Sequence, residues 1–464
     1  MKKFAIIYGA YETGAQKKAL SLLSESLLTE TKAYPACYRA GEAVPEGFCK
    51  IFIGTRENNP IFAEAFPATL SHAEEYRIAV KNGTVYIEGF DDSGVLYGIV
   101  DFFAKYLTSL SYPNDDRYYV PCFEGDLPDY ERISHPAIKS RGLWTWGHVI
   151  YDYRGYIDHM VRLKLNTITI WNDQIPVNAR EIIDYAHDCG IKVIFGYSWL
   201  WDTDCKKIPL DKLCDYSESI FETYEKKYSH LGLDGIYFQS ATEHRAHTID
   251  GIIVAEAITN FVNHTAALFF EKYPHLELQF GLHATSVKNR LTYLEKTDPR
   301  IRIVWEDVGA FPFSYMPCDV DTFEETKELT EKIAHLRGED DRFGVVTKGL
   351  TKLDWYTFKH PDFPLNIGVS TRELKEDRIL RKKKIWRYLE AYWLINADKA
   401  LDMIALMNRL KKGDLVVSAL VEDGMFEENI MYPVALFAEM LWEPDADIRN
   451  LMSSVALRSD VSFA

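Results

Sequence analysis

The sequence predicts an α/β protein in which a small α/β domain precedes a (β/α)8 barrel. The main observation is an alternation of strand-like and helical runs that begins near residue 138. Repeated strand-then-helix units are typical of a parallel sheet, and eight strands favour closure. An open doubly wound sheet is the alternative, but no glycine-rich phosphate loop follows its first strand. The eight strand-like runs are 140–145, 167–171, 192–196, 235–239, 277–281, 302–305, 342–347 and 415–420.

Helical patterns fill most of the gaps between these strands. Apolar residues recur there at intervals of three and four, which is the spacing of one buried helix face. A barrel takes roughly 250 residues or more, so a chain of 464 residues leaves room for one further domain. The predicted helices are 153–163, 179–189, 211–228, 251–272, 321–336 and 377–408, with a closing helix at 432–441.

The N-terminal domain is predicted to cover residues 1–125, and the barrel domain residues 126–464. Asn82 and Gly83 separate two strand-like runs, and an Asn-Gly pair in this setting predicts a β-hairpin. Residues 111–136 hold four prolines and no apolar period, so we expect a linker there. The predicted elements of this domain are strands 3–9, 50–54, 75–80 and 84–88 and helices 16–28 and 91–106.

The charge of the chain and its cysteine content indicate which kinds of binding partner and which cellular compartment to expect. The chain has 69 acidic and 53 basic residues, a net charge of −16, which disfavours binding to nucleic acid. The basic run 381–384 falls in a helical pattern, and we interpret it as a solvated helix face. The seven cysteines form no CxxC pair, which indicates free thiols and a cytoplasmic protein. No apolar run approaches the ~20 residues that span a membrane, and the apolar run at the N-terminus is too short for a signal peptide.

The loop after the fourth barrel strand is the centre of the predicted active site. Catalytic groups of a (β/α)8 barrel lie at the C-terminal ends of its strands. Here the run 235–239 leads into Ser240, Thr242, Glu243 and His244. A glutamate just beyond a buried strand can have its pKa raised by partial desolvation, which suits a catalytic acid. We therefore predict Glu243 as that acid; an exposed loop glutamate is the alternative.

Other strand ends carry residues suited to carbohydrate, because flat aromatic faces stack on sugar rings and polar groups bind hydroxyls. Glu306 and Asp307 follow the sixth strand. Since adjacent residues of a strand point to opposite sides, only one of them should face the cleft. We favour Glu306 as the second catalytic carboxylate. Arg141 could donate two hydrogen bonds to a diol or carboxylate, or be a structural arginine at the barrel rim. The predicted substrate-binding residues are Arg141, Trp144, Trp146, Asn172, Trp199, Trp201, His244, His283, Asp307, Lys348 and Trp355.

Metal and cofactor motifs are absent from the sequence. His244 and His247 are three residues apart, but they lie in a loop and no HExxH pattern is present. There is also no P-loop and no GxSxG elbow. We therefore expect neither a metal nor a cofactor.

Three segments resemble glycoside hydrolases. Residues 74–102, EEYRIAVKNGTVYIEGFDDSGVLYGIVDF, resemble the small βαββα domain before the barrel in family 20 β-hexosaminidases and family 67 α-glucuronidases. Residues 234–244, DGIYFQSATEH, are similar to the acid-bearing loop of α-glucuronidases, and 433–444, PVALFAEMLWEP, to the closing helix. The resemblance implies a non-catalytic N-terminal domain, Glu243 as acid and Glu306 as base, with inversion of configuration. Thr242 stands where family 20 enzymes have the aspartate that orients the acetamido group, which disfavours a substrate-assisted hexosaminidase.

The resulting hypothesis is a glycoside hydrolase that cleaves O-glycosyl bonds of oligosaccharides or glycosides with two carboxylates. The alternatives are a carbohydrate-binding barrel without catalysis, and a lyase or isomerase that uses His283 or Lys348 as base. The sugar, its anomer and its linkage stay open. So does the oligomeric state, with a homodimer as one option, because many relatives have a further helical domain that can supply dimer contacts.

Overall fold

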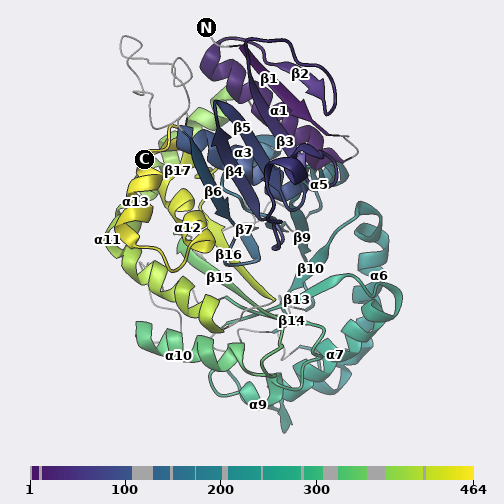
Figure 1. The fold of residues 1–464 in the computed structure, drawn as a ribbon. Helices are drawn as coiled ribbons and strands as arrows, with labels where there is room; N and C mark the ends of the chain where they lie inside the picture. The colour runs from purple at the N-terminus through teal and green to yellow at the C-terminus, as the bar shows by residue number, and fades with distance from the viewer. Residues whose placement is uncertain are drawn as a thin grey trace.

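The chain folds into an N-terminal sheet unit and a closed barrel (Figure 1). The computed structural model describes residues 3–9, 13–106, 129–146, 150–172, 174–200, 207–241, 244–283, 287–306, 322–352, 371–410 and 414–464. None of the helices in these ranges combines the length and the apolar character that crossing a membrane requires.

The N-terminal unit is a six-stranded sheet with the order β2-β1-β3-β5-β4-β6. Strands β1, β2, β3 and β5 run parallel, whereas β4 is antiparallel to both of its neighbours. The strands are β1 (Lys3–Tyr8), β2 (Ala36–Arg39), β3 (Phe48–Thr55), β4 (Tyr76–Lys81), β5 (Thr84–Gly89) and β6 (Tyr130–Ser134). The helices are α1 (Gly14–Thr31), α2 (Ile61–Ala65) and α3 (Asp92–Tyr106).

Local sequence signals account for two features of this unit. Asn82 and Gly83 have φ of 50° and 73°, the left-handed values of a two-residue hairpin turn, and Lys81 pairs with Thr84 across it. This confirms the predicted hairpin. Helix α1 begins with a capping box, in which the Thr13 hydroxyl accepts from the Gln16 backbone and the Gln16 side chain accepts from the Thr13 backbone.

Strand β6 corrects the predicted linker. Residues 130–134 were expected to be irregular, yet they pair with β4, from Tyr76–Ser134 to Val80–Tyr130. In β6, half-buried and exposed residues alternate regularly, but the half-buried face includes Arg132 and Ser134, so the sequence shows no apolar period there. The sheet therefore includes residues beyond 125, and the division of the chain at that point stays a prediction.

The barrel closes in the order β7-β8-β9-β10-β13-β14-β15-β16, and β16 pairs with β7. Every pairing in it is parallel. This confirms all of the predicted barrel strands and their order. They are β7 (Ser140–Trp146), β8 (Thr167–Trp171), β9 (Lys192–Gly196), β10 (Gly235–Phe238), β13 (Glu277–Leu282), β14 (Arg302–Trp305), β15 (Phe343–Leu350) and β16 (Leu415–Val421).

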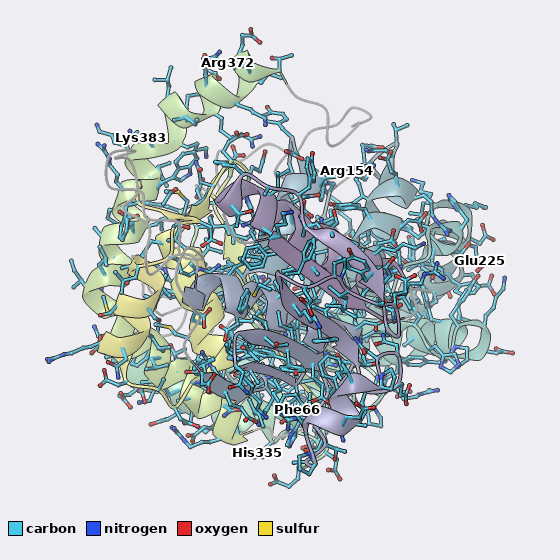
Figure 2. All side chains as sticks on the ribbon, turned by 45° about the horizontal axis from the view of Figure 1, so that its top comes forward. Phe66, Arg154, Glu225, His335, Arg372 and Lys383 are labelled. Carbon is cyan, nitrogen blue, oxygen red and sulfur yellow. The ribbon has the colours of Figure 1, made fainter. Side chains whose placement is uncertain are left out.

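Helices surround the barrel, with α6 and α7 on one side and α11, α12 and α13 on the other (Figure 1). Helix α11 is 39 residues long, and its first turns reach to the edge of the molecule, with Arg372 near the tip and Lys383 further along (Figure 2). The helices are α4 (Tyr153–Arg162), α5 (Ala179–Asp188), η2 (Leu210–Tyr216), α6 (Ser217–Lys227), η3 (Ser229–Leu231), α7 (Val254–Lys272), α9 (Leu291–Leu294), α10 (Phe323–Ala334), α11 (Arg372–Leu410), α12 (Tyr432–Trp442) and α13 (Ile448–Ala456). Two small ribbons pair β11 (Thr248–Ile249) with β12 (Ile252–Ile253) and β17 (Ile430–Met431) with β18 (Val461–Ser462).

The two units meet at the N-terminal end of the barrel. Trp442 lies between them, with ring centroids 5.9 Å from Tyr76 and 5.8 Å from Tyr97, and its indole nitrogen donates to Ser134. The guanidinium of Arg141 lies 5.1 Å from the Trp442 ring. Because these side chains are buried, the N-terminal unit covers this end of the barrel and leaves the opposite end for a site.

Candidate active site

The barrel interior is filled by aromatic side chains from its first, second and fourth strands. The rings of Trp144 and Trp146 on β7 lie 5.9 Å apart, and Trp171 on β8 lies 6.0 Å from Trp146. Tyr237 on β10 packs 5.0 Å from Trp144 and 5.7 Å from Trp171. Alternate residues of each strand point inward, so the tryptophans at 144 and 146 share one side of β7. Together with Ile194, Val304, Val346 and Leu420, these residues form a packed floor.

Above this floor stands Glu306, directly after β14. Its side chain is fully buried, and one carboxylate oxygen, Oε1, accepts hydrogen bonds from the Tyr237 hydroxyl and from Nε2 of Gln239. The other oxygen, Oε2, lies 3.3 Å from Nε2 of His283 and 3.5 Å from Nζ of Lys348. Tyr237 lies on β10 and Gln239 directly follows it, His283 follows β13, and Lys348 lies near the end of β15. Residues from three other strands therefore converge on this carboxylate at the C-terminal end of the barrel.

The two oxygens of this carboxylate have different surroundings. Hydroxyl and amide donors contact Oε1, whereas the His283 ring and the Lys348 ammonium lie near Oε2. An isolated buried charge would be strongly destabilising, so the surrounding groups are what permit Glu306 to lie here. Such a carboxylate can accept a proton, attack a carbon centre or stabilise positive charge that develops on a ligand.

Gly281 on β13 makes room for these contacts. A Cβ at this position would collide with the Tyr237 hydroxyl and with Oε1 of Glu306. Only glycine lets the two groups approach each other across β13, which lies between β10 and β14 in the barrel. The backbone of β13 is thus part of the site, although residue 281 offers no functional group.

Sequence reasoning identified three members of this cluster and missed two. Glu306, His283 and Lys348 were predicted site residues, and the structure brings them together. Tyr237 and Gln239 were interpreted as ordinary residues of a buried strand. The sequence contained a signal for both residues. Positions 235, 237 and 239 alternate along the strand, so the polar groups of Tyr237 and Gln239 share one face, which is the barrel interior.

Other predicted site residues lie near the same opening. Trp144 and Trp146 are in the interior, 1% and 4% exposed. Asn172 directly follows β8 and is buried, and neither atom of its amide has a hydrogen-bond partner within the described ranges. His244 lies in the loop after β10, where its Nδ1 accepts from the Ala246 backbone. The predicted residues Glu243, Trp201, Asp307 and Trp355 lie outside the described residues.

Two predicted substrate-binding residues are elsewhere. Arg141 is the second residue of β7, so it lies at the end of the barrel opposite Glu306, where it is fully buried. Its guanidinium donates to the carbonyls of Ile138, Lys139 and Lys164 and to Glu74 at 2.8 Å. The prediction that it binds substrate is therefore wrong, and the structural alternative holds.

Trp199 was also predicted to line the cleft, and the structure places it elsewhere. It is fully buried, and its ring stacks on Phe238 at 3.7 Å and on Phe269 of α7 at 5.3 Å. It therefore packs between the barrel wall and helix α7 instead of lining the interior. Ile194 of β9 faces the barrel interior, so residue 199, an odd number of positions further on, falls on the outer face. The backbone N–H groups of Tyr197 and Trp199 still donate to the carbonyls of Tyr237 and Gln239, so strand geometry continues to this point.

Arg290 stabilises the loop after β10. Its guanidinium donates to three successive carbonyls, those of His244, Arg245 and Ala246, at 2.8, 3.0 and 3.1 Å. Burial lowers the pKa of Arg290 from its ordinary value. Ala241, which precedes these residues, has a left-handed φ of 46°, so the chain turns sharply as it leaves the strand.

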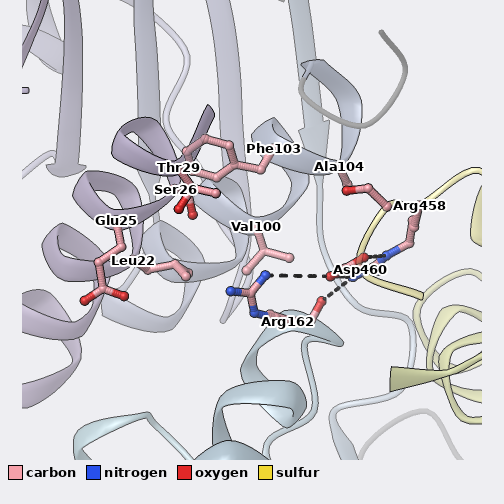
Figure 3. A pocket seen from close by; sticks show the side chains of 11 residues that line it. Leu22, Glu25, Ser26, Thr29, Val100, Phe103, Ala104, Arg162, Arg458 and Asp460 are labelled. Carbon is pink, nitrogen blue, oxygen red and sulfur yellow. Dashed lines mark hydrogen bonds and ion pairs between the residues drawn. The ribbon is translucent and has the colours of Figure 1, made fainter. Parts of the chain in front are cut away.

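A cavity of about 190 Å³ lies elsewhere, between the N-terminal unit and the bottom of the barrel (Figure 3). Asp460 stands at its edge, 2.8 Å from Arg458 and 4.0 Å from Arg162. Burial alone would raise the pKa of Asp460, but Arg458 outweighs it and the pKa is lowered. The acidic and basic groups at this edge thus compensate one another. The lining includes Leu22, Ser26, Val100, Phe103 and Ala104.

In the described part of the chain, no group of three or more His, Cys, Asp or Glu side chains is placed to hold a metal ion. Among the described cysteines, Cys37, Cys189 and Cys214 are free, and the Cys49 thiol donates to the carbonyl of Gly83.

The fold and the site together define an α/β protein with a closed parallel barrel, an additional sheet unit and a polar cluster at the C-terminal strand ends. No protein-family model matches the chain, and no curated protein matches its sequence. Among solved structures it is similar to a family GH115 4-O-methyl-α-glucuronidase with specificity for decorated arabinogalactans, at a TM-score of 0.54 and 13% identity. The match covers 97% of this chain but 57% of that one, so this chain spans little more than half of its length. The likeness shows the fold, and the predicted resemblance to families 20 and 67 stays a prediction.

Proposed function

We propose that this protein is a glycoside hydrolase in which Glu306 is one of two catalytic carboxylates. The observation that carries the proposal is the contact set of Glu306. This buried carboxylate stands at the C-terminal end of the barrel, where enzymes of this fold have their active sites. It is contacted by Tyr237, Gln239, His283 and Lys348.

Glycoside hydrolysis needs a protonated carboxyl at the leaving oxygen and a second carboxylate on the side of the anomeric carbon. Glu306 accepts hydrogen bonds from Tyr237 and Gln239 and has the Lys348 ammonium near its other oxygen, so we assign it the second role. We assign the acid to Glu243, which follows β10. Only β13 lies between β10 and β14, and two strand spacings amount to about 10 Å. Side chains from both strand ends could therefore reach one glycosidic bond.

The proposed substrate is an oligosaccharide or glycoside, with an α-glucuronoside as the first choice. Two independent lines support this choice: the sequence resembles α-glucuronidases around residues 234–244, and the fold resembles a GH115 4-O-methyl-α-glucuronidase. The aromatic floor formed by Trp144, Trp146 and Trp171 supports a sugar ligand, because indole rings pack well against the apolar faces of sugar rings. The resemblance to α-glucuronidases favours inversion, which ¹H NMR of the first-formed anomer would test.

The experiment is a comparison of carboxylate variants on a panel of aryl glycosides. Glu306→Gln should abolish turnover of every substrate, because the step at the anomeric carbon is lost whichever group leaves. Glu243→Gln should abolish cleavage of alkyl glycosides, whose leaving oxygen needs a proton, while sparing aryl glycosides with good leaving groups. Glu390→Gln, a buried glutamate on α11 outside the barrel interior, is the matched control and should keep full activity.

Each alternative function has its own outcome in this experiment. Binding of a sugar without hydrolysis of any glycoside would indicate a carbohydrate-binding barrel. Formation of an unsaturated or isomerised product that depends on His283 or Lys348 would indicate a lyase or isomerase. Full activity of Glu306→Gln would refute the proposed role of that residue.

A further inference from the structure

Gln239 has an amide whose orientation is set by its neighbours. Its Nε2 lies 2.5 Å from Oε1 of Glu306, 3.3 Å from Nε2 of His283 and 3.5 Å from the Tyr237 hydroxyl. Turning the amide over would place its oxygen against the Glu306 carboxylate, which is repulsive because both are acceptors. The NH2 group therefore faces Glu306, and Oε1 points away from it.

This amide oxygen is buried and has no hydrogen-bond partner among the residues that the structure describes. Gln239 as a whole is 1% exposed. Burying an acceptor without a donor destabilises a protein, because the acceptor loses its hydrogen bonds to water. The Nε2 group already donates to Glu306, so within the described residues the oxygen is the part of this amide without a hydrogen bond.

One further unmatched polar atom lies close to this cluster. The ring of Trp144, 5.0 Å from that of Tyr237, carries an indole N–H that has no acceptor in the described ranges. The amide oxygen of Gln239 needs a donor and this N–H needs an acceptor, and a hydroxyl group can serve as either. Both atoms therefore suit a ligand with hydroxyl groups, as a sugar has.

We infer that Gln239 determines substrate specificity by accepting a hydrogen bond from one hydroxyl of the sugar whose bond is cleaved. The inference rests on the proposed sugar substrate and extends it: Glu306 orients the amide, and the amide oxygen selects the hydroxyl. A site built to bind a hydroxyl rejects analogues that lack it, because its own polar group is then left unpaired. Gln239 thus couples the position of the ligand to the carboxylate beside it.

The first test needs no variant of the protein. Binding of methyl α-glycosides of glucuronic acid, glucose, galactose and mannose is followed by tryptophan fluorescence, and the tightest binder is then replaced by its monodeoxy and monodeoxyfluoro analogues. One position should matter most, with affinity falling about 5- to 150-fold on deoxygenation. The fluoro analogue at that position should lose as much as the deoxy analogue, because fluorine cannot donate. A fluoro analogue that binds like the parent sugar at every position would overturn the inference.

The second test uses Gln239→Met, which keeps the length of the side chain and removes the amide. The variant should bind the parent sugar and its deoxy analogue equally, while the wild type discriminates between them. Gln279→Met is the matched control, because Gln279 is a buried glutamine on β13 whose amide donates to Glu277 at 2.7 Å; its discrimination should equal that of the wild type. If Gln239→Met lowered affinity for every analogue by one common factor, Gln239 would only position Glu306.

Failure of the inference and failure of the proposed function look different. Discrimination that depends on Gln239, in a protein that hydrolyses no glycoside, would refute the hydrolase and leave the inference standing for a sugar-binding barrel. Hydrolysis without such discrimination would do the reverse. If no sugar of the panel bound at millimolar concentration, the inference itself would be wrong.

Discussion

The ion pair between Arg141 and Glu74 is predicted to hold the two units of the chain together. The Arg141→Met variant removes the guanidinium while keeping most of the apolar stem. Glu74 would lose its contact at 2.8 Å, although its other oxygen would still accept from Asn166. The carbonyls of Ile138, Lys139 and Lys164 would lose their donor as well.

The expected cost follows from the burial of the pair. The side chains of Arg141 and Glu74 are 1% and 15% exposed, and breaking a buried pair by removing one partner costs about 3–5 kcal/mol. We expect about 4 kcal/mol. With an m-value of about 3 kcal/mol/M or more for a chain of this size, the midpoint of urea unfolding should fall by roughly 1 M.

Urea unfolding followed by circular dichroism measures this loss. The matched control is Arg154→Met, because Arg154 and its partner Glu181 lie on the surface, 65% and 61% exposed (Figure 2), and such pairs contribute less than about 1 kcal/mol. A double-mutant cycle with Glu74→Gln isolates the coupling between the two residues. Equal losses for Arg141→Met and Arg154→Met, or a coupling near zero, would refute the assignment.

Two further predictions concern the site and acid stability. Gly281→Ala should lower the free energy of unfolding by about 1–3 kcal/mol and remove glycosidase activity, because the added methyl group collides with Tyr237 and Glu306. Urea unfolding and turnover assays would measure the two effects. Unchanged activity would contradict the geometry. Glu277 and Asp414 both contact Arg302, at 2.7 Å each; burial alone would raise their pKa values, but Arg302 outweighs it and both pKa values are lowered. The stabilisation by these two carboxylates is therefore present above their unfolded-state pKa values of about 4. It is lost as the pH falls through their folded-state pKa values, so the urea midpoint of Glu277→Gln should depend less on pH below about 4.5 than the midpoint of the wild type. Parallel curves of urea midpoint against pH would show that the pair contributes nothing.

The sequence by itself determined the barrel strands, most of the helices between them and the class of fold. The barrel strands were predictable because each is a short apolar run between a helical pattern and a polar loop, and both patterns are local. The Asn82–Gly83 turn was predictable because few residues other than glycine and asparagine adopt left-handed φ readily. Glu306, His283 and Lys348 could be predicted as site residues because each falls at the end of a barrel strand, where the fold itself directs side chains to one opening.

Only the tertiary structure decided which of these side chains meet and which do not. Trp144 and Trp199 are both tryptophans near strand ends, yet one faces the barrel interior and the other packs against α7. They fall on opposite faces of their strands, and only the closed barrel shows which face is the interior. Arg141 was predicted at the C-terminal end of the barrel, but it is the second residue of β7 and so lies at the N-terminal end. The position of a residue along its strand decides at which end of the barrel its side chain lies. The contacts of Tyr237 and Gln239 with Glu306 join residues more than 60 positions apart. Such contacts depend on the register of closed, parallel strands, which no local pattern encodes.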